Sequence, residues 1–340
     1  MRTLQVPGLD QLDRRIIAAL QIHGRATWQQ IAGATGSSDS TVARRAQRLF
    51  GEGLAQVVAT TDPLLCVEGY PVLVEITTTA GSVTQVAKAL AGRTDVRFAA
   101  LLTGSFDLVV ELIVSSQAEL ARVLLTEIDR IPGVWATKTE SVLSHYKLEH
   151  TWLQTDLPTE AAELLVQHRG TVTPGEPRPL DERERALVDL LSVDARASIA
   201  DMAQQLGASE TSVRRRLDNL LSEGRVRLST LVDPELLGYS APAMYWLHMD
   251  LRHVDDAAKT LTRCPEVRYV AATSGHSNIT LEVVLRDQAD LHRFNTEVLG
   301  GLPGLHRAEA GQQLATLRRA FVLNRRTLAL IDTAEEETHA

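Results

Sequence analysis

The spacing of hydrophobic residues changes along the chain in a fixed order. From Asp10 onward, apolar residues recur every three or four positions through three short segments, which predicts three amphipathic helices. The third segment, 38–50, starts at a serine cap, buries its apolar stripe and turns hydroxyls and arginines outward. The second and third segments are joined by a tight turn that contains Gly36. This arrangement predicts a helix-turn-helix, whose second helix enters the major groove of DNA.

After Pro63 the spacing becomes that of strands interrupted by helices. The expected order is β-α-β-β-α-β, the split ferredoxin-like arrangement. The segment just before it, 56–61, alternates like the wing or linker strand of a helix-turn-helix domain. The expected strands and helices, in chain order, cover 72–76, 83–90, 96–102, 108–114, 118–131 and 134–144.

The same pattern occurs a second time, 171 residues later. Leu9-Asp10 matches Leu180-Asp181, and Arg44-Arg45 matches Arg215-Arg216. The match of Tyr70 with Tyr239 suggests a local slip of two residues. One register held over about 130 residues indicates tandem duplication of a whole unit. The corresponding second-half elements are expected at 244–251, 257–262, 267–273, 279–285, 289–299 and 308–322.

The expected fold class is therefore α+β, with two copies of a helix-turn-helix domain followed by a ferredoxin-like βαββαβ sheet domain. The joining segment is predicted to contain a short helix over 159–168 and a Pro-rich, partly extended, exposed stretch over 171–179. The expected domains are 9–62 and 180–233 (helix-turn-helix), 63–152 and 234–328 (ferredoxin-like), 153–179 (linker) and 329–340 (acidic tail).

Composition narrows the possible partners. The formal net charge is −8, so contact with nucleic acid must come from local basic patches. The chain has two cysteines, Cys66 and Cys264, without metal-ligand spacing, and no apolar run long enough to cross a membrane. An aromatic content of 4% argues against base-stacking platforms for single strands. We therefore expect a cytoplasmic protein whose nucleic-acid partner is double-stranded DNA.

Polar and basic residues on the two predicted recognition helices, with the residues that start the preceding helices, are the candidate DNA contacts. Ser38 and Ser209 are expected to cap their helices first. Arg45 and Arg216 have an alternative role in ion pairs with acids such as Glu52 and Glu223, and Trp28 is expected in the core. The candidates are Thr27, Ser38, Ser40, Thr41, Arg44, Arg45, Arg48, Ser198, Ser209, Thr211, Ser212, Arg214, Arg215 and Arg216.

This unit resembles the leucine-responsive and asparagine regulators, the Lrp/AsnC family. The resemblance rests on residues 12–20, Gly24-Arg25, Glu52-Gly53, residues 103–108 and residues 131–134, and on their counterparts in the second half. It implies a transcriptional regulator modulated by an amino acid or a related small metabolite. Family members usually have one unit per chain and dimerise through their sheets, so we expect an internal pseudo-dimer and further homo-oligomerisation. Because the second recognition helix carries different outward residues, the chain is expected to read an asymmetric site.

The resemblance places the effector near the turn at Gly104 and Asp107. Its glycine permits a tight turn, and its carboxylate would hold an ammonium group. An ordinary hairpin turn with a solvated aspartate is an equal alternative. The second-half counterpart has Gly275 and Asn278, which lacks the charge, so that half binds either no amino acid or a different ligand.

Enzyme readings find little support in the sequence. It has no Gly-rich phosphate loop, no HExxH and no GxSxG, so no catalytic residue, cofactor or metal is expected. The alternative is a siroheme decarboxylase, because such enzymes use the same two-domain unit and some are fused in tandem. The segment that would contact a tetrapyrrole, 239–249, lacks the His-rich, Asn-containing strand start associated with them.

Overall fold

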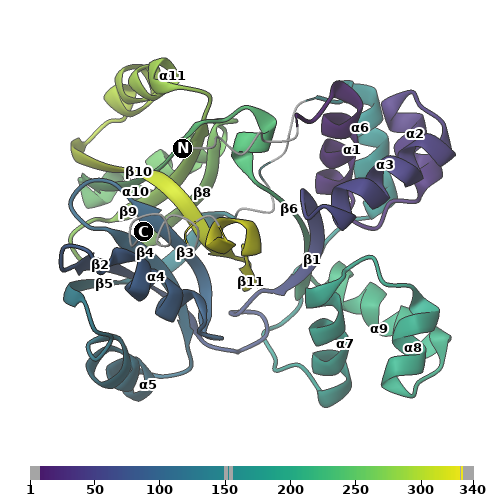
Figure 1. Ribbon diagram of the computed structural model, residues 1–340, viewed down its shortest axis with the longest axis horizontal. Coiled ribbons are helices and arrows are strands. Elements are labelled where there is room, and N and C mark those ends of the chain that lie inside the picture. Colours follow the sequence, from purple (N-terminus) through teal and green to yellow (C-terminus); the bar gives the residue numbers. More distant parts are fainter. Residues whose placement is uncertain (1–7, 149–151, 153–155, 330, 332–340) are drawn as a thin grey trace, which may run out of the picture. The chain divides into compact units, whose positions relative to one another are not determined.

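The chain is divided into two compact units, and each unit contains segments from both sequence copies (Figure 1). The computed structural model describes residues 8–148, 152, 156–329 and 331. The first unit, called the head unit, combines Met1–Val67 with Leu153–Gly238. The second, called the sheet unit, combines Glu68–Trp152 with Tyr239–Ala340. The two compact units therefore do not correspond to the two sequence copies.

The first head of the head unit is a bundle of three helices. They are α1 (Gln11–Ile22), α2 (Trp28–Thr35) and α3 (Asp39–Gly51). Asp10, Thr27 and Ser38 each accept a hydrogen bond from a backbone N–H of the first turn, which satisfies donors that have no partner within the helix. Gly36 ends α2 in the left-handed conformation, and this produces the tight turn before α3.

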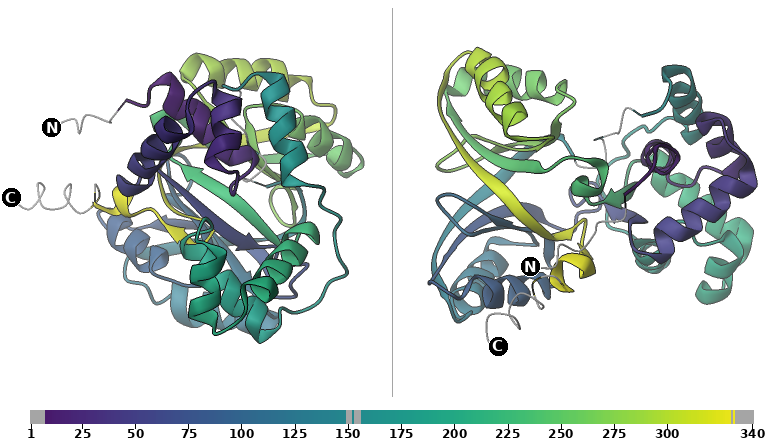
Figure 2. Two further views of the ribbon diagram at one scale, coloured as in Figure 1. Left: turned by 90° about the vertical axis from the view of Figure 1, so that its right-hand side faces the viewer. Right: turned by 45° about the horizontal axis from the view of Figure 1, so that its top comes forward.

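The second head repeats this bundle, and one strand from each head joins the two. Its helices are α7 (Glu182–Val193), α8 (Ile199–Leu206) and α9 (Glu210–Ser222). Strand β1 (Ala55–Thr61) follows the first head and pairs antiparallel with β6 (Val226–Val232), which follows the second. Figure 2 shows the two strands side by side, with the helices of one head on each side of them. The strand predicted as a wing or linker strand therefore joins the heads.

The segment between the copies packs on both heads. Helix α6 (Thr159–Arg169) lies against α1 and α2 and buries Leu165. The Pro-rich stretch after it is held by backbone hydrogen bonds, among them Thr173 N–H to Ser222 O at 2.8 Å and Arg178 N–H to Leu65 O at 3.0 Å. It is extended and mostly exposed, as expected, and its backbone is hydrogen-bonded to the second head and to Leu65. The short 3-10 helix η3 (Pro234–Leu237) ends the head unit.

The sheet unit contains one sheet of nine strands among the described residues. The first copy supplies β2 (Tyr70–Thr78), β3 (Val96–Leu102), β4 (Leu108–Val114) and β5 (Val134–Lys147). The second copy supplies β7 (Ala241–Met249), β8 (Val267–Thr273), β9 (Ile279–Leu285), β10 (Leu305–Arg319) and β11 (Val322–Leu323). The long strands β5 and β10 extend beyond the predicted element boundaries.

The long strands join the two halves of this sheet. The first part of β5 pairs with β2 of its own copy, and its last part pairs with β8 of the other copy. Strand β10 pairs in the same way with β7 and then with β3. Because β10 is bonded to both, the sheet closes on itself. The expected pseudo-dimer is thus formed by continuous strand pairing, which leaves few open edges.

The strands also correct the predicted slip in register. Strand β2 begins at Tyr70 and β7 begins at Ala241, an offset of 171 residues like that of the flanking elements. Tyr70 opposes Val114, and Ala241 opposes Leu285, again at the same offset. Tyr239 precedes β7, so its match with Tyr70 was a coincidence of residue type.

Helices cover the outer face of the closed sheet. The first copy contributes α4 (Val83–Ala91) and α5 (Gln117–Arg122), and the second α10 (Val254–Thr262) and α11 (Gln288–Arg293). The predicted helix 118–131 is not a uniform α-helix, because α5 continues as a π-helix, η1 (Val123–Ile128). Its counterpart η5 (Phe294–Val298) is followed by the 3-10 helix η6 (Leu299–Gly301), and η4 (Leu251–His253) precedes α10.

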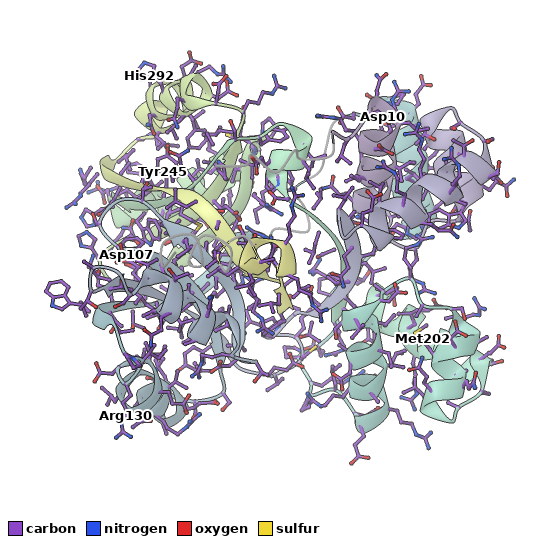
Figure 3. The ribbon with its side chains drawn as sticks, viewed as in Figure 1. Asp10, Asp107, Arg130, Met202, Tyr245 and His292 are labelled. Carbon is purple, nitrogen blue, oxygen red and sulfur yellow. The ribbon has the colours of Figure 1, made fainter. Side chains whose placement is uncertain are left out.

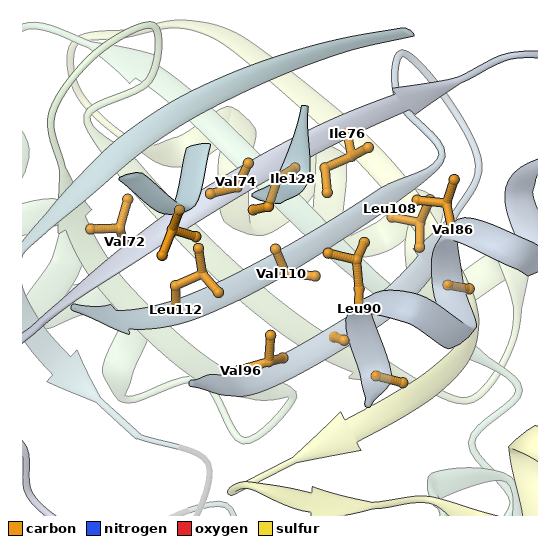
Figure 4. Close-up of a cluster of buried hydrophobic side chains, with 14 of the residues drawn as sticks. Val72, Val74, Ile76, Val86, Leu90, Val96, Leu108, Val110, Leu112 and Ile128 are labelled. Carbon is orange, nitrogen blue, oxygen red and sulfur yellow. The ribbon is translucent and has the colours of Figure 1, made fainter. Parts of the chain in front are cut away.

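Three hydrophobic clusters hold the sheet unit together. One lies between α4 and the strands β2 and β4, and includes Val74, Leu90 and Val110 (Figure 4). A second covers the same face of the second copy. A third includes Leu73, Phe98, Met244 and Tyr269 and joins strands of both copies inside the closed sheet. No helix of the described residues combines the length and the apolar character needed to cross a membrane.

Candidate nucleic-acid interface and effector region

The predicted DNA contacts lie on corresponding surfaces of the two heads. Thr27 and Ser198 cap α2 and α8, and Ser38 and Ser209 cap α3 and α9, as expected for the last two. All four caps are exposed, as are Ser40 on α3 and Thr211 on α9. Thr41 and Ser212 are half-buried. Exposed helix N-termini with hydroxyl side chains are suited to phosphate oxygens.

Three of the predicted arginines are held in ion pairs inside their own head. Arg45 pairs with Asp10 and, at 3.1 Å, with Asp13, while Arg48 contacts Asp13 at 2.6 Å and Glu52 at 3.4 Å. The Asp13 backbone N–H and the Arg45 guanidinium together lower the pKa of Asp10, which is labelled in Figure 3. These pairs tie α3 to α1.

The second head has a corresponding ion pair between its first and third helices, with fewer charged residues. Arg216 contacts Asp181 at 2.9 Å and thereby links α9 to α7. The expected partners, Glu52 for Arg45 and Glu223 for Arg216, are not the ones used, since acids at the start of the first helix lie closer. Arg45, Arg48 and Arg216 therefore orient their helices, and this structural role precedes any DNA contact.

Arg44 and Arg215 occupy equivalent positions and are exposed, as is Arg214. None of the three makes an ion pair among the described residues. An exposed guanidinium on a recognition helix has all five donors available for a phosphate or for the O6 and N7 atoms of guanine. These side chains have the chemistry of the predicted contact. The second head has one more of them than the first, because Ala43 stands where the second head has Arg214.

Two arginines that are not among the predicted DNA contacts lock the heads together. Arg25 donates to the carbonyl oxygens of Ala195 and Ala197 at 2.6 and 3.0 Å. Arg196 donates to those of Gly24 and Ala26 at the same distances. Arg25-Ala26 and Arg196-Ala197 lie 171 positions apart in the sequence, but only the fold shows that each arginine binds the backbone of the other head. With the β1–β6 ladder, it fixes the distance between the recognition helices.

Trp28 is a part of this contact rather than of a core. The guanidinium carbon of Arg196 lies 4.1 Å from the centroid of its ring, and the indole is half-buried. The expectation of core packing was wrong, because the other head covers the ring with a cation. Burial, followed by repulsion from Arg25, lowers the pKa of Arg196 to about 10, so the guanidinium stays charged at neutral pH.

The carboxylate at the predicted effector turn is hydrogen-bonded within the protein. Asp107 accepts hydrogen bonds from the backbone N–H and the hydroxyl of Thr78, at 2.7 and 2.8 Å, and so closes the end of β2. Gly104 has a φ of +112°, as a tight turn requires, and lies against the backbone of β10 at Ala310. Asp107 is thus a structural residue at the end of β2, and both of these hydrogen bonds use the same carboxylate oxygen.

The second-half turn is built in the same way but contacts a carboxylate of the chain itself. Asn278 exchanges two hydrogen bonds with the backbone of Met249, at 3.1 and 2.6 Å, where Asp107 bonds Thr78. The buried carboxylate of Glu140, on β5, accepts from the backbone N–H and the hydroxyl of Ser277 at 2.9 and 2.7 Å. Gly275 packs on the same side chain. The position equivalent to Glu140 in the second copy is Gly311, so the two turns differ in chemistry.

Comparison with known protein families agrees with this architecture in both copies. A model of the AsnC-type helix-turn-helix domain matches residues 9–49 and 180–221. A model of the Lrp/AsnC ligand binding domain matches residues 71–152 and 243–317. An HTH-type transcriptional regulator of Pyrococcus abyssi is 30% identical over 131 residues, which cover 83% of that protein and 38% of this chain. The chain belongs to the Lrp/AsnC family of DNA-binding transcriptional regulators.

Other Lrp/AsnC relatives also correspond to a single copy. The regulator FL11 of Pyrococcus abyssi is 34% identical over 83% of its length, and LrpA of Pyrococcus horikoshii is 30% identical over 90% of its length. Each of these matches covers 37% of this chain. The chain is therefore a tandem duplication of the Lrp/AsnC unit.

One solved structure is similar over nearly the full length of this chain. The siroheme decarboxylase NirDL covers 96% of the chain with all of its own length, at a TM-score of 0.60 and 14% identity. At that identity the likeness shows a shared fold in which two such units are combined. It carries no information on whether the two proteins share chemistry.

Proposed function

We propose that the two heads of one chain bind adjacent half-sites of an asymmetric operator, and that a small metabolite bound by the sheet unit modulates this binding. The observation that carries the proposal is the pair of exposed arginines, Arg44 and Arg215, at equivalent positions on two recognition helices that are locked together. Phosphate contacts would position each head, while α3 and α9 would read base edges in the major groove.

The second part of the proposal is that the halves of the operator differ in sequence. The exposed residues of α3 include Arg44 and Gln47, whereas those of α9 include Arg214, Arg215 and Asp218. A carboxylate such as that of Asp218 accepts a hydrogen bond from cytosine N4, whereas a glutamine pairs with adenine. Two unlike helices at a fixed distance therefore favour a site without a twofold axis.

The test is selection of duplexes from a random pool, followed by salt titration of the selected duplex. Replacing Arg44 or Arg215 by alanine is expected to weaken binding and to reduce the slope of log K against log salt by about one for each lost phosphate contact. Arg183→Ala is the matched control, because it removes one exposed arginine of α7, outside the recognition helix. Unchanged specific binding in the Arg44→Ala/Arg215→Ala double variant would refute the assignment.

We further propose that the chain has no enzymatic activity of its own, in contrast to NirDL. The cavity inside its sheet unit has a volume of about 20 Å³, which is room for one water molecule and far too little for a tetrapyrrole. Incubation with siroheme tests this proposal. Loss of carboxylate groups from the tetrapyrrole would overturn it, whereas a colourless protein that shifts duplex DNA is the expected result.

A further inference from the structure

In each head an arginine bridges the start of the first helix and the end of the third, but the two arginines come from different parts of the chain. In the first head Arg48, on α3, contacts Asp13 near the start of α1 at 2.6 Å and Glu52 at the end of α3 at 3.4 Å. Asp13 is buried, and a buried carboxylate requires a cation. In this head the recognition helix itself supplies it.

The second head keeps the two acids of this bridge and lacks the arginine. The positions equivalent to Asp13 and Glu52 are Glu184 and Glu223, whereas the position equivalent to Arg48 is Asn219. An asparagine has no charge with which to balance a buried carboxylate. The cation for Glu184 therefore has to come from elsewhere.

The cation comes from the Pro-rich stretch of the linker. Arg178 contacts both oxygens of Glu184, each at 2.7 Å, and lies 3.8 Å from Glu223. Glu184 is 6% exposed, and the hydrogen bonds from Arg178 are the main cause of its lowered pKa. The first copy has Pro7 at the position equivalent to Arg178. The second head thus takes from the linker the charge that the first head takes from its recognition helix.

The backbone around Arg178 is fixed next to the second head. Arg178 donates its N–H to Leu65 O at 3.0 Å, and its carbonyl accepts from Arg225 Nη1 at 3.2 Å. Arg225 is 2% exposed and also donates to Leu65 O at 2.6 Å. The position equivalent to Arg225 in the first copy is Leu54, whose side chain has no donor for such a contact. These bonds hold the Arg178 guanidinium beside the two carboxylates.

The exchange leaves a free amide on the second recognition helix. Asn219 is exposed, and its side-chain amide has no hydrogen-bond partner in the part of the chain that the structure describes. It follows Arg215 by four positions, so both side chains lie on one face of α9, one turn apart. An asparagine amide can donate to N7 of adenine and accept from N6 at the same time. Arg48, at the equivalent position of α3, is half-buried and held in ion pairs.

We propose that Arg178 is a positioning residue of the second head and that it releases Asn219 to read a base of the second half-site. Arg178 holds α7 and the end of α9 together, as Arg48 does for the helices of the first head. Asn219 contacts a base edge in the major groove, with adenine as the preferred base. This inference rests on the proposed function, because it names a specificity-determining residue of the same interface. The linker is thereby a working part of the second head.

Selection of duplexes with Asn219→Ala tests the base contact. The variant removes a side chain that has no structural partner, so it should fold as the natural chain does. Discrimination at one base pair of the second half-site is expected to fall about tenfold or more, and the slope of log K against log salt should stay the same, because the amide carries no charge. Gln167→Ala, which removes an exposed amide of α6, is the matched control and should select the natural sequence.

A charge exchange tests the positioning role without DNA. Arg178→Leu leaves the buried carboxylate of Glu184 without its cation, so amide hydrogen exchange in α7 should accelerate about tenfold or more. Adding Asn219→Arg supplies the cation from the recognition helix, as in the first head, and should bring the rate back towards that of the natural chain. The same double variant should still lack the discrimination at the base pair that Asn219 reads.

Two results would overturn the inference. One is that Asn219→Ala selects the natural sequence with undiminished discrimination, and the other is that Asn219→Arg fails to slow the exchange of Arg178→Leu. Failure of the proposed function looks different. A natural chain that selects no duplex refutes the operator and with it the base contact, whereas the charge exchange, measured without DNA, still decides the role of Arg178.

Discussion

Single residues of this protein show how far a sequence pattern specifies chemistry. The caps Ser38 and Ser209 were predictable, because a hydroxyl residue immediately before an amphipathic stretch has one local role. Arg45 was not, since the acids that hold it lie 32 and 35 positions away, on a helix that only the fold brings near. Asp107 was predicted as a ligand contact, and its use at the end of β2 depends on strand register, which a single sequence does not give.

A buried carboxylate of the sheet unit gives a prediction on pH. Burial, followed by repulsion from Glu140, raises the pKa of Glu75 to about 7 from the ordinary 4.5, although Lys138 lies 3.5 Å away. Because the folded state holds a proton that the unfolded state releases, this group's contribution to stability is lost as pH rises from 4.5 to about 7. Urea denaturation across this range is expected to show a flatter pH profile in Glu75→Gln than in the natural chain.

The control for this experiment is Glu160→Gln, which replaces an exposed carboxylate of α6. Its profile should follow that of the natural chain. A Glu75→Gln profile that is as steep as the natural one would show that another group is responsible.

At the scale of elements, the order of helices and strands followed from residue spacing, whereas their pairing did not. The ladder between β1 and β6 joins segments that are 171 residues apart and have no complementary sequence feature. The closure of the sheet was not predictable for the same reason. It depends on β5 and β10, which each change partners part-way along their length. Local spacing predicts a strand, but the partner of a strand depends on which chain segments are close in space.

The contact between the heads gives a prediction for these elements. Arg25→Ala removes two hydrogen bonds from a charged donor to backbone carbonyls, and leaves the oxygens of Ala195 and Ala197 without them. A loss of about 1.5–3 kcal/mol in the stability of the head unit is expected. Amide hydrogen exchange should accelerate in β1 and β6, and Arg183→Ala should leave it unchanged. Unaltered exchange in Arg25→Ala would mean that the strand ladder alone holds the heads.

For the whole molecule, duplication was the strongest signal in the sequence, and it gave the fold class of both copies. It also predicted that the two sheet domains pair inside one chain, but it did not reveal that the two heads form a second unit joined by β1 and β6. The residues of one copy do not indicate which face of its domains packs against the other copy. The buried ion pairs inside the closed sheet were missed for the same reason, since Arg97, Glu111 and Glu282 read as ordinary polar positions of strands.

The proposed asymmetry of the operator gives the last prediction. Changing the exposed positions of α9 to those of α3, with Arg214→Ala, Asp218→Gln and Asn219→Arg, should make duplex selection yield a site closer to an inverted repeat. The natural chain should yield two unlike half-sites about one helical turn apart. Selection of the same sequence by both proteins would show that these residues do not read bases.

The contrast between Glu140 and Gly311 has a wider consequence. In an assembly of identical subunits every substitution occurs twice, so a change that helps one side of the axis is forced on the other. Here each side mutates independently, and a carboxylate suits one turn while a bare backbone suits its twin. Covalent fusion has thereby released the Lrp/AsnC architecture from symmetry, so that one half can acquire a new specificity while the other keeps the old one.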